Sequence, residues 1–186
     1  MKRIVVGISG ASGTIYGVRL LEALSQIEGI ETHLILSHGA RVTMEYETSI
    51  KADDLEKLAH VSHSPNNLAA PISSGSFKTD GMVVAPCSMK SLAMIANSID
   101  DNLLVRAADV TLKERRKLVL IVRETPLHLG HLRQMTTVTE IGATILPPVP
   151  SFYHNPKTIE DIIDQTIGKA LDQLGIDHNL FERWGS

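Results

Sequence analysis

The side chains best suited to chemistry stand directly after apolar runs of this sequence. The first group is the stretch SGASG at residues 9–13, which joins an apolar run to a segment with helical spacing. Glycines there let a phosphate approach backbone N–H groups at a helix start, where the helix dipole also favours an anion. A plain strand-to-helix turn with Ser12 as the N-cap fits equally well. The glycine spacing matches neither an NTPase nor a dinucleotide motif.

An Arg-Glu pair follows the apolar run KLVLIV. Arg123 could clamp a phosphate through two parallel hydrogen bonds, and a surface ion pair is the alternative. Glu124 could act as a general acid or base if partial burial raises its pKa, and a solvated carboxylate is the alternative. Tyr153, in PSFYHNP, follows a later apolar run, where its hydroxyl could reach a ligand or its ring could anchor a loop.

Other polar residues give weaker signals. Arg106 and Lys113 share a helix face but stand roughly 10 Å apart along the axis, so they cannot easily grip one small phosphate together. Spacing alone favours Lys113 as a partner of the helix C-terminal dipole. His128 and His131 lie one turn apart without a cysteine or acidic cluster, so we predict no metal site. Cys87 is better explained by packing than by nucleophilic chemistry.

Apolar runs alternate with helical patterns along the whole chain. Strands are expected at residues 3–8, 31–37, 81–86, 117–124 and 143–150, and a long ordered loop is expected at 61–79. One helix is expected after the first strand, and others at 38–47, 87–99, 101–115, 131–142 and 159–176. This order favours an α/β fold with an open, doubly wound, mostly parallel sheet and helices on both faces. Ligands bind such sheets beyond the carboxyl ends of the strands.

Composition limits the classes of function. A chain of 186 residues with 43% apolar content can bury one sizeable core, so we expect a single domain spanning 1–186. A net charge of −3 and few aromatic residues disfavour a nucleic-acid surface. No apolar run approaches the roughly 18 residues of a membrane span, and no signal-peptide pattern precedes the first strand. A lone cysteine fits a reducing cytoplasm.

Seven motifs, in order and nearly end to end, resemble the UbiX-like flavin prenyltransferases, formerly called phenylacrylate or 3-octaprenyl-4-hydroxybenzoate carboxy-lyases. They are GISGASG, SHGARVTMEYE, SSGSF, PCSMKSLAMIA, DNLLVRAADVTLKERRKLVLIVRETPLH, PPVPSFYHNP and ALDQLGI. The resemblance implies a Rossmann-like flavoprotein that joins the dimethylallyl group of dimethylallyl phosphate to N5 and C6 of reduced FMN. The product, prenylated FMN, is supplied to a UbiD-type decarboxylase. The sequence lacks a D-D-x-x-D cluster, which fits a metal-independent reaction of a monophosphate.

The resemblance also implies roles for individual residues. The positions that match FMN-binding residues are Gly10, Ala11, Ser12, Ser37, Ser88, Met89, Lys90, Ser91 and Arg123. The positions that match dimethylallyl phosphate contacts are Tyr153 and Lys169, with Lys113 and Arg106 close by. Trp184 resembles an aromatic residue that reaches a neighbouring subunit's site in dodecameric relatives, so a homo-oligomer is implied.

Acidic residues complete the implied catalytic set. Glu47 and Glu124 match positions tied to proton handling and site organisation, beside the phosphate-facing Lys113 and Tyr153. The family often has arginine at the position of Lys169, where a lysine offers a point charge instead of a bidentate fork. Two alternatives remain: an FMN-dependent cysteine decarboxylase of the same fold, and a noncatalytic flavin carrier that accompanies a decarboxylase. PCSMKS and LKERRKLVLIVRETP disfavour the first of these.

Overall fold

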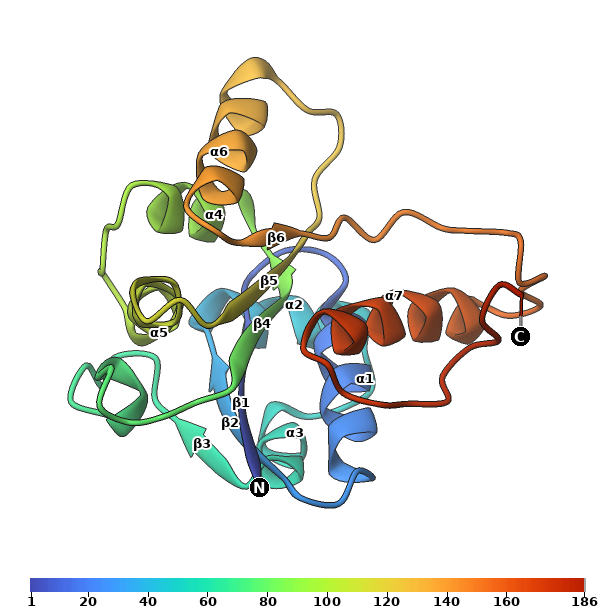
Figure 1. The fold of residues 1–186 in the computed structure, drawn as a ribbon, viewed down its shortest axis with the longest axis horizontal. Helices are drawn as coiled ribbons and strands as arrows, with labels where there is room; N and C mark the ends of the chain where they lie inside the picture. Colours follow the sequence, from blue (N-terminus) through green and yellow to red (C-terminus); the bar gives the residue numbers. More distant parts are fainter. Residues whose placement is uncertain (186) are drawn as a thin grey trace.

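A six-stranded parallel sheet forms the centre of the molecule, in a computed structural model that describes residues 1–185 (Figure 1). The strands are β1 (Lys2–Ile8), β2 (Ile30–Leu36), β3 (Val61–His63), β4 (Gly81–Cys87), β5 (Lys117–Val122) and β6 (Thr144–Ile145). Their spatial order is β3-β2-β1-β4-β5-β6, and each neighbouring pair is parallel. The order reverses between β1 and β4, the point at which doubly wound sheets bind their ligands.

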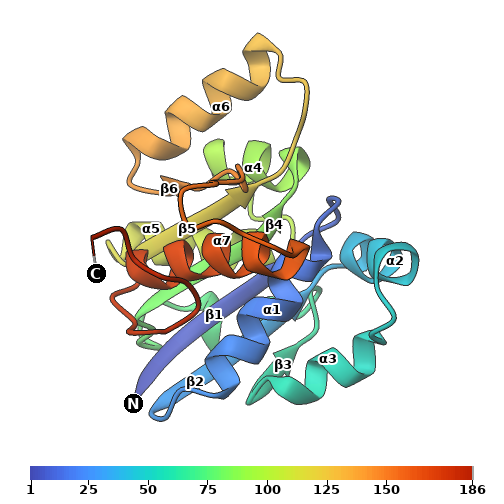
Figure 2. The same ribbon diagram turned by 90° about the vertical axis from the view of Figure 1, so that its right-hand side faces the viewer.

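Helices cover both faces of this sheet (Figures 1 and 2). The helices are α1 (Thr14–Ser25), α2 (His38–Glu47), α3 (Ala52–Leu58), α4 (Met89–Ala96), α5 (Leu103–Lys113), α6 (Leu129–Glu140) and α7 (Ile159–Gln173), with a 3₁₀ turn, η1 (Pro71–Ser73). One buried cluster joins the sheet to α1, α2, α3 and α7, and a second joins it to α4, α5, α6 and η1. The expected doubly wound α/β fold is confirmed.

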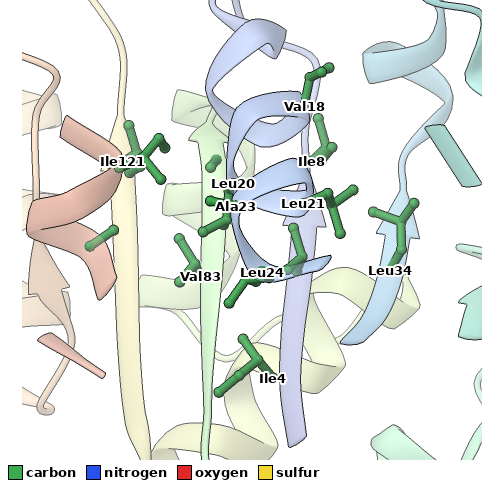
Figure 3. Packing of buried hydrophobic residues seen from close by; sticks show 14 of the residues in the cluster. Ile4, Ile8, Val18, Leu20, Leu21, Ala23, Leu24, Leu34, Val83 and Ile121 are labelled. Atoms are coloured by element: carbon green, nitrogen blue, oxygen red, sulfur yellow. The ribbon is translucent and has the colours of Figure 1, made fainter. Parts of the chain in front are cut away.

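Alternation along the strands explains the two clusters. Ile4 and Ile8 of β1 belong to the same cluster as Leu21 and Leu24 of α1 (Figure 3), whereas Val5 belongs to the opposite cluster. Successive side chains of a strand point to opposite faces, so a strand buried on both sides reads as a continuous apolar run. Gly17 brings α1 close to the sheet, because a Cβ there would lie 2.4 Å from the carbonyl oxygen of Ala85.

Most elements lie within three residues of their expected bounds, and two regions differ. The expected strand 143–150 is wrong beyond Ile145: β6 has two residues, since Pro147 and Pro148 have no N–H to continue the ladder. The structure also contains three short elements that were not expected: α3, β3 and η1. Leu55 is the buried residue of α3, so that helix carries little apolar periodicity. Among residues 1–185, no helix is long and apolar enough to cross a membrane.

Candidate functional site

A cleft of about 610 Å³ opens at the carboxyl edge of the sheet, around the ends of β1 and β4. Its volume falls within the range of roughly 300–1,000 Å³ that is usual for small-molecule sites. The lining residues are Ser9, Gly10, Ser37, His38, Gly39, Pro65, Asn66, Ser88, Met89, Lys90, Ser91, Met94, Asp101, Asn102 and Glu124. Six of the nine predicted FMN-binding residues therefore lie together here, with Glu124.

Three helices begin at this cleft. The side chains of Ser37, Ser88 and Asn102 are the N-caps of α2, α4 and α5, and each accepts a hydrogen bond from a first-turn N–H. The acceptor distances are 3.1, 3.2 and 3.2 Å. Each helix start carries partial positive charge, so three of them facing one cleft favour an anionic ligand. These termini fit a phosphate-bearing group such as FMN.

Close backbone contact fixes one wall of the cleft. A Cβ on Gly10 would lie 2.9 Å from the backbone C and Cα of Gly39, so the loop after β1 touches the first turn of α2. The Ser9 hydroxyl donates to the carbonyl of Pro86 at 2.8 Å and accepts from the N–H of Ser88 at 2.7 Å. These bonds tie the loop after β1 to the loop after β4. The two loops that line the cleft are therefore fixed relative to each other.

The N-terminus of α1 is occupied by a carboxylate of the chain itself. Glu47 Oε2 accepts from the N–H groups of Gly13 (2.8 Å) and Thr14 (3.1 Å) and from the Thr14 hydroxyl (3.1 Å). The N-cap residue is Gly13, with a positive φ of 99° and no side-chain cap, so the alternative of Ser12 as the N-cap is wrong. Partial burial raises the pKa of Glu47, but bonds from Ser12, Gly13 and Thr14 together outweigh it and lower the pKa.

Replacing Glu47 by glutamine is expected to destabilise the protein by about 1 kcal/mol at pH 7, because the charge opposite the start of α1 is lost. The folded-state pKa of Glu47 is lowered, so its contribution exists above the unfolded-state pKa and disappears as the pH falls through the folded-state value. Urea unfolding of both proteins at pH 7 and near pH 3.5 measures this: the difference should shrink on acidification. Glu45→Gln, exposed on the same helix, is the control; a Glu47→Gln deficit that persists unchanged in acid contradicts the assignment.

A second cavity, of about 280 Å³, lies at the end of the loop after β1 that leads into α1. It is lined by Ser12, Gly13, Ile15, Tyr16, Arg123, Pro148, Ile159 and Ile163. The Tyr16 phenol is half-buried; burial raises its pKa and the positive charge of Arg123 partly opposes the rise. Arg123 and Glu124 are consecutive, and each lines a different one of the two cavities. Glu124 Oε1 accepts from the Thr125 N–H at 2.9 Å.

Residues 1–173 match the Flavoprotein family. A protein of Thauera aromatica named flavin prenyltransferase UbiX is 60% identical over 182 residues, which are 98% of this chain and 93% of that protein. This chain belongs to the UbiX flavin prenyltransferases. The crystal structure of the family member AnUbiX (PadA1) in complex with FMN and dimethylallyl pyrophosphate has a TM-score of 0.97 and 50% identity, covering 100% of this chain and 98% of that one.

A second solved member of the prenyltransferase family comes from Escherichia coli O157:H7. It is described as a dodecameric FMN-dependent UbiX-like decarboxylase, with a TM-score of 0.96, 48% identity, and coverage of 99% of this chain and 100% of that one. The FMN-dependent cysteine decarboxylase TvaF is 16% identical with a TM-score of 0.67, which shows a shared fold alone. The comparisons place the chain among the flavin prenyltransferases, as the motifs predicted.

The predicted substrate-binding residues of the flavin prenyltransferase lie in two separate regions. Tyr153 and Trp184 meet edge to face, with ring centroids 5.8 Å apart, and Lys169 lies farther along α7. Arg106 is on α5, where its guanidinium bonds Asp100, Asp109 and the carbonyl of Ser73. Lys113 ends α5, about 15 Å along the axis from the start of that helix at the cleft. Lys113 pairs there with Glu114 at 2.5 Å, so one chain does not bring it to the cleft.

Ala11, Cys87 and His128 each lie at or near the end of a strand or the start of a helix. Ala11 lies in the loop after β1, where its N–H donates to the carbonyl of Ser9 at 2.9 Å. Cys87 is fully buried and burial raises the pKa of its thiol to about 12, which agrees with a packing role. His128 is the N-cap of α6 and accepts from the Gly130 N–H at 3.0 Å. Within residues 1–185, no group of three or more metal-ligating side chains is present.

Several residues of the site were not expected from the sequence. Tyr16, His38 and Asn66 line the cavities without a local signal for that role. Asn102 had a usable signal, because an asparagine directly before an apolar helical run is typical of an N-cap. Asn66 reaches the cleft from the loop after β3, a strand that was itself not predicted.

Proposed function

We propose that the protein joins the dimethylallyl group of dimethylallyl phosphate to N5 and C6 of reduced FMN and passes the prenylated FMN to a UbiD-type decarboxylase. The observation that carries this proposal is the cleft on which three helix N-termini converge, at the switch point of the sheet, in a chain that belongs to the flavin prenyltransferases. The whole chain would act as one flavin-binding domain, and the cytoplasm is the proposed location.

The residues around the cleft fit a flavin phosphate. The helix starts at Ser37 and Ser88 offer backbone N–H groups beside Gly10, and Arg123 offers a bidentate fork from the second cavity. Accepting an N–H bond through its oxygen leaves the Ser37 hydroxyl with a hydrogen to donate. Reduced FMN, when bound, would supply the nucleophilic atoms and a π face beside the allylic group.

The protein's own side chains would handle charge and protons. Tyr153 and Lys169, together with Lys113 of a neighbouring copy of the chain, are proposed to stabilise the negative charge that develops on the departing phosphate. Glu124 is proposed to accept a proton at Oε2, because Oε1 already bonds the Thr125 N–H. Glu47 is proposed to stay ionised and to hold the start of α1 in place, as its lowered pKa supports.

Complete sites are proposed to form between subunits of a dodecamer, the assembly described for the E. coli O157:H7 relative. Arg106 and Lys113 lie on α5, which covers the face of the sheet opposite α7, Tyr153 and Trp184. A single phosphate can be held by both groups only if they come from different copies of the chain. Trp184, with 83% of its surface exposed, is proposed to contact the site of a neighbouring subunit.

Mixing the protein with reduced FMN and dimethylallyl phosphate without oxygen tests the proposal. The flavin should gain the mass of one C5 unit, measured by mass spectrometry, and a parallel reaction with dimethylallyl diphosphate defines the donor. Bound but unchanged FMN would identify a flavin carrier instead. An oxidatively decarboxylated peptidyl-cysteine would identify the cysteine decarboxylase. Loss of CO₂ from an aromatic acid supplied to the isolated protein would support the older name.

A further inference from the structure

The C-terminal segment after α7 folds back on that helix (Figure 1) and is fixed there by one carboxylate. Asp172, near the end of α7, accepts two bonds from the Arg183 guanidinium, at 2.7 and 3.1 Å. His178 Nε2 lies 3.2 Å from the same carboxylate, while its Nδ1 accepts from the Leu180 N–H at 3.2 Å. Since Nδ1 is an acceptor, Nε2 carries the hydrogen and donates to Asp172.

A glycine of α7 makes room for this segment. A Cβ on Gly168 would lie 2.4 Å from the Phe181 ring and 2.5 Å from the His178 ring, so both rings rest directly on the helix backbone. His178 is almost fully buried, with 2% of its side chain exposed. The C-terminal segment is therefore held on α7 both by packing at Gly168 and by the ion pair of Asp172 with Arg183. We call this contact surface on α7 the seat of the segment.

The seat contacts two of the proposed substrate-binding residues. The ammonium of Lys169 lies 5.6 Å from the centre of the Phe181 ring, a cation–π distance. Trp184 follows Arg183 directly, and its ring stands on the edge of the Tyr153 ring. The Tyr153 hydroxyl also accepts from Gln165 of α7 at 3.4 Å. The segment that Asp172 holds therefore carries both the ring that contacts Lys169 and the ring that contacts Tyr153.

We propose that Asp172, Gly168 and Phe181 are positioning residues for the dimethylallyl phosphate site: they seat the C-terminal segment so that Lys169 and Tyr153 face the substrate phosphate. This proposal rests on the proposed function. The chemistry of Lys169 gives the proposal a physical reason. Its flexible ammonium lacks the fixed fork of a guanidinium, so its position depends more on a neighbouring ring that holds it. The segment acts on substrate binding and leaves the flavin cleft unchanged.

The test compares Asp172→Asn with Asp164→Asn in the full-length protein. Asp164 is on the same helix and also accepts bonds from an arginine, Arg19, at 2.5 and 3.2 Å, and this partner belongs to α1 and not to the C-terminal segment. Trp184 is the sole tryptophan of the chain, so its fluorescence anisotropy, read before flavin is added, reports the seating of the segment. Asp172→Asn should lower this anisotropy and raise the KM for dimethylallyl phosphate at least about tenfold.

In the same variant, kcat should fall as KM rises, because Lys169 and Tyr153 are also proposed to stabilise the departing phosphate. FMN affinity should stay within about twofold of the parent protein, and Asp164→Asn should leave anisotropy, kcat and KM unchanged. Gly168→Ala, which unseats Phe181 without altering charge, should reproduce both effects, and Arg183→Ala provides a surface variant if Asp172→Asn fails to fold. Equal anisotropy in the two aspartate variants would overturn the seating. Reduced anisotropy with both KM and kcat unchanged would overturn the positioning role. If the parent protein makes no prenylated flavin, the proposed function fails, and anisotropy still decides the seating.

Discussion

Glutamine in place of Glu124 is expected to slow formation of prenylated FMN by about 100-fold or more, since positioned general acids and bases typically contribute factors of 10² to 10⁴. The variant keeps the side chain's shape and the oxygen that accepts from the Thr125 N–H, so the loop after β5 should hold its conformation. It removes the proton acceptor at Oε2. Affinity for FMN should therefore remain within about twofold.

Single-turnover product formation without oxygen measures this rate, and flavin titration measures the affinity. Glu140→Gln provides the control, because Glu140 is exposed at the far end of α6, away from the cleft. A variant rate equal to that of the parent would remove Glu124 from the catalytic set. Weak flavin binding with an unchanged rate at saturation would make Glu124 a binding residue.

Alanine in place of Gly10 is expected to weaken FMN binding at least about tenfold and to lower the stability of the fold. The new Cβ would meet two backbone atoms of Gly39 at 2.9 Å, and backbone cannot move aside as a flexible side chain can. Overpacking of this kind costs about 1–3 kcal/mol. For a chain of this size, each kcal/mol lowers Tm by about 2–4 °C. The loop after β1 would have to move away from α2 and widen the cleft.

Gly39→Ala is the graded comparison for this prediction. Its Cβ would lie 3.3 Å from the Gly10 Cα, a contact that needs a shift of only a few tenths of an ångström. The Tm from thermal unfolding and the FMN affinity from flavin titration should therefore be lowest for Gly10→Ala, intermediate for Gly39→Ala and highest for the parent protein. An FMN affinity of Gly10→Ala equal to that of the parent would show that this close contact does not shape the cleft.

Local sequence pattern was enough to predict most strands of the sheet and the edge of the sheet at which the cleft lies. Apolar runs identified five of six strands, and the rule that parallel sheets bind ligands beyond their carboxyl ends agrees with the position of the cleft at the ends of β1 and β4. β3 escaped because its three residues, VSH, are too few to show a pattern and are more exposed than a central strand. The roles of Lys113 and Lys169 in phosphate binding came from family resemblance, because the spacing of these two residues does not predict such a role.

Contacts between distant residues account for what the sequence did not predict. Glu47 reaches the start of α1 across 34 positions of the chain, and the tie between Ser9 and Ser88 spans 79. Propensity and periodicity describe neighbours within a few turns, so they are silent about such pairs. For the same reason, the sequence offered Ser12 as the N-cap of α1. In the structure, Glu47 of α2 accepts from the N–H groups of Gly13 and Thr14 instead.

The carboxylate at the start of α1 has a thermodynamic consequence for association. A glycine-rich loop would ordinarily become ordered around its ligand, and that loss of backbone freedom would subtract from affinity by roughly 1–2 kcal/mol for each residue that becomes fixed. Here Glu47 has already ordered the loop in the free chain. An incoming flavin would meet a preorganised surface, so little of its interaction energy is lost to conformational entropy.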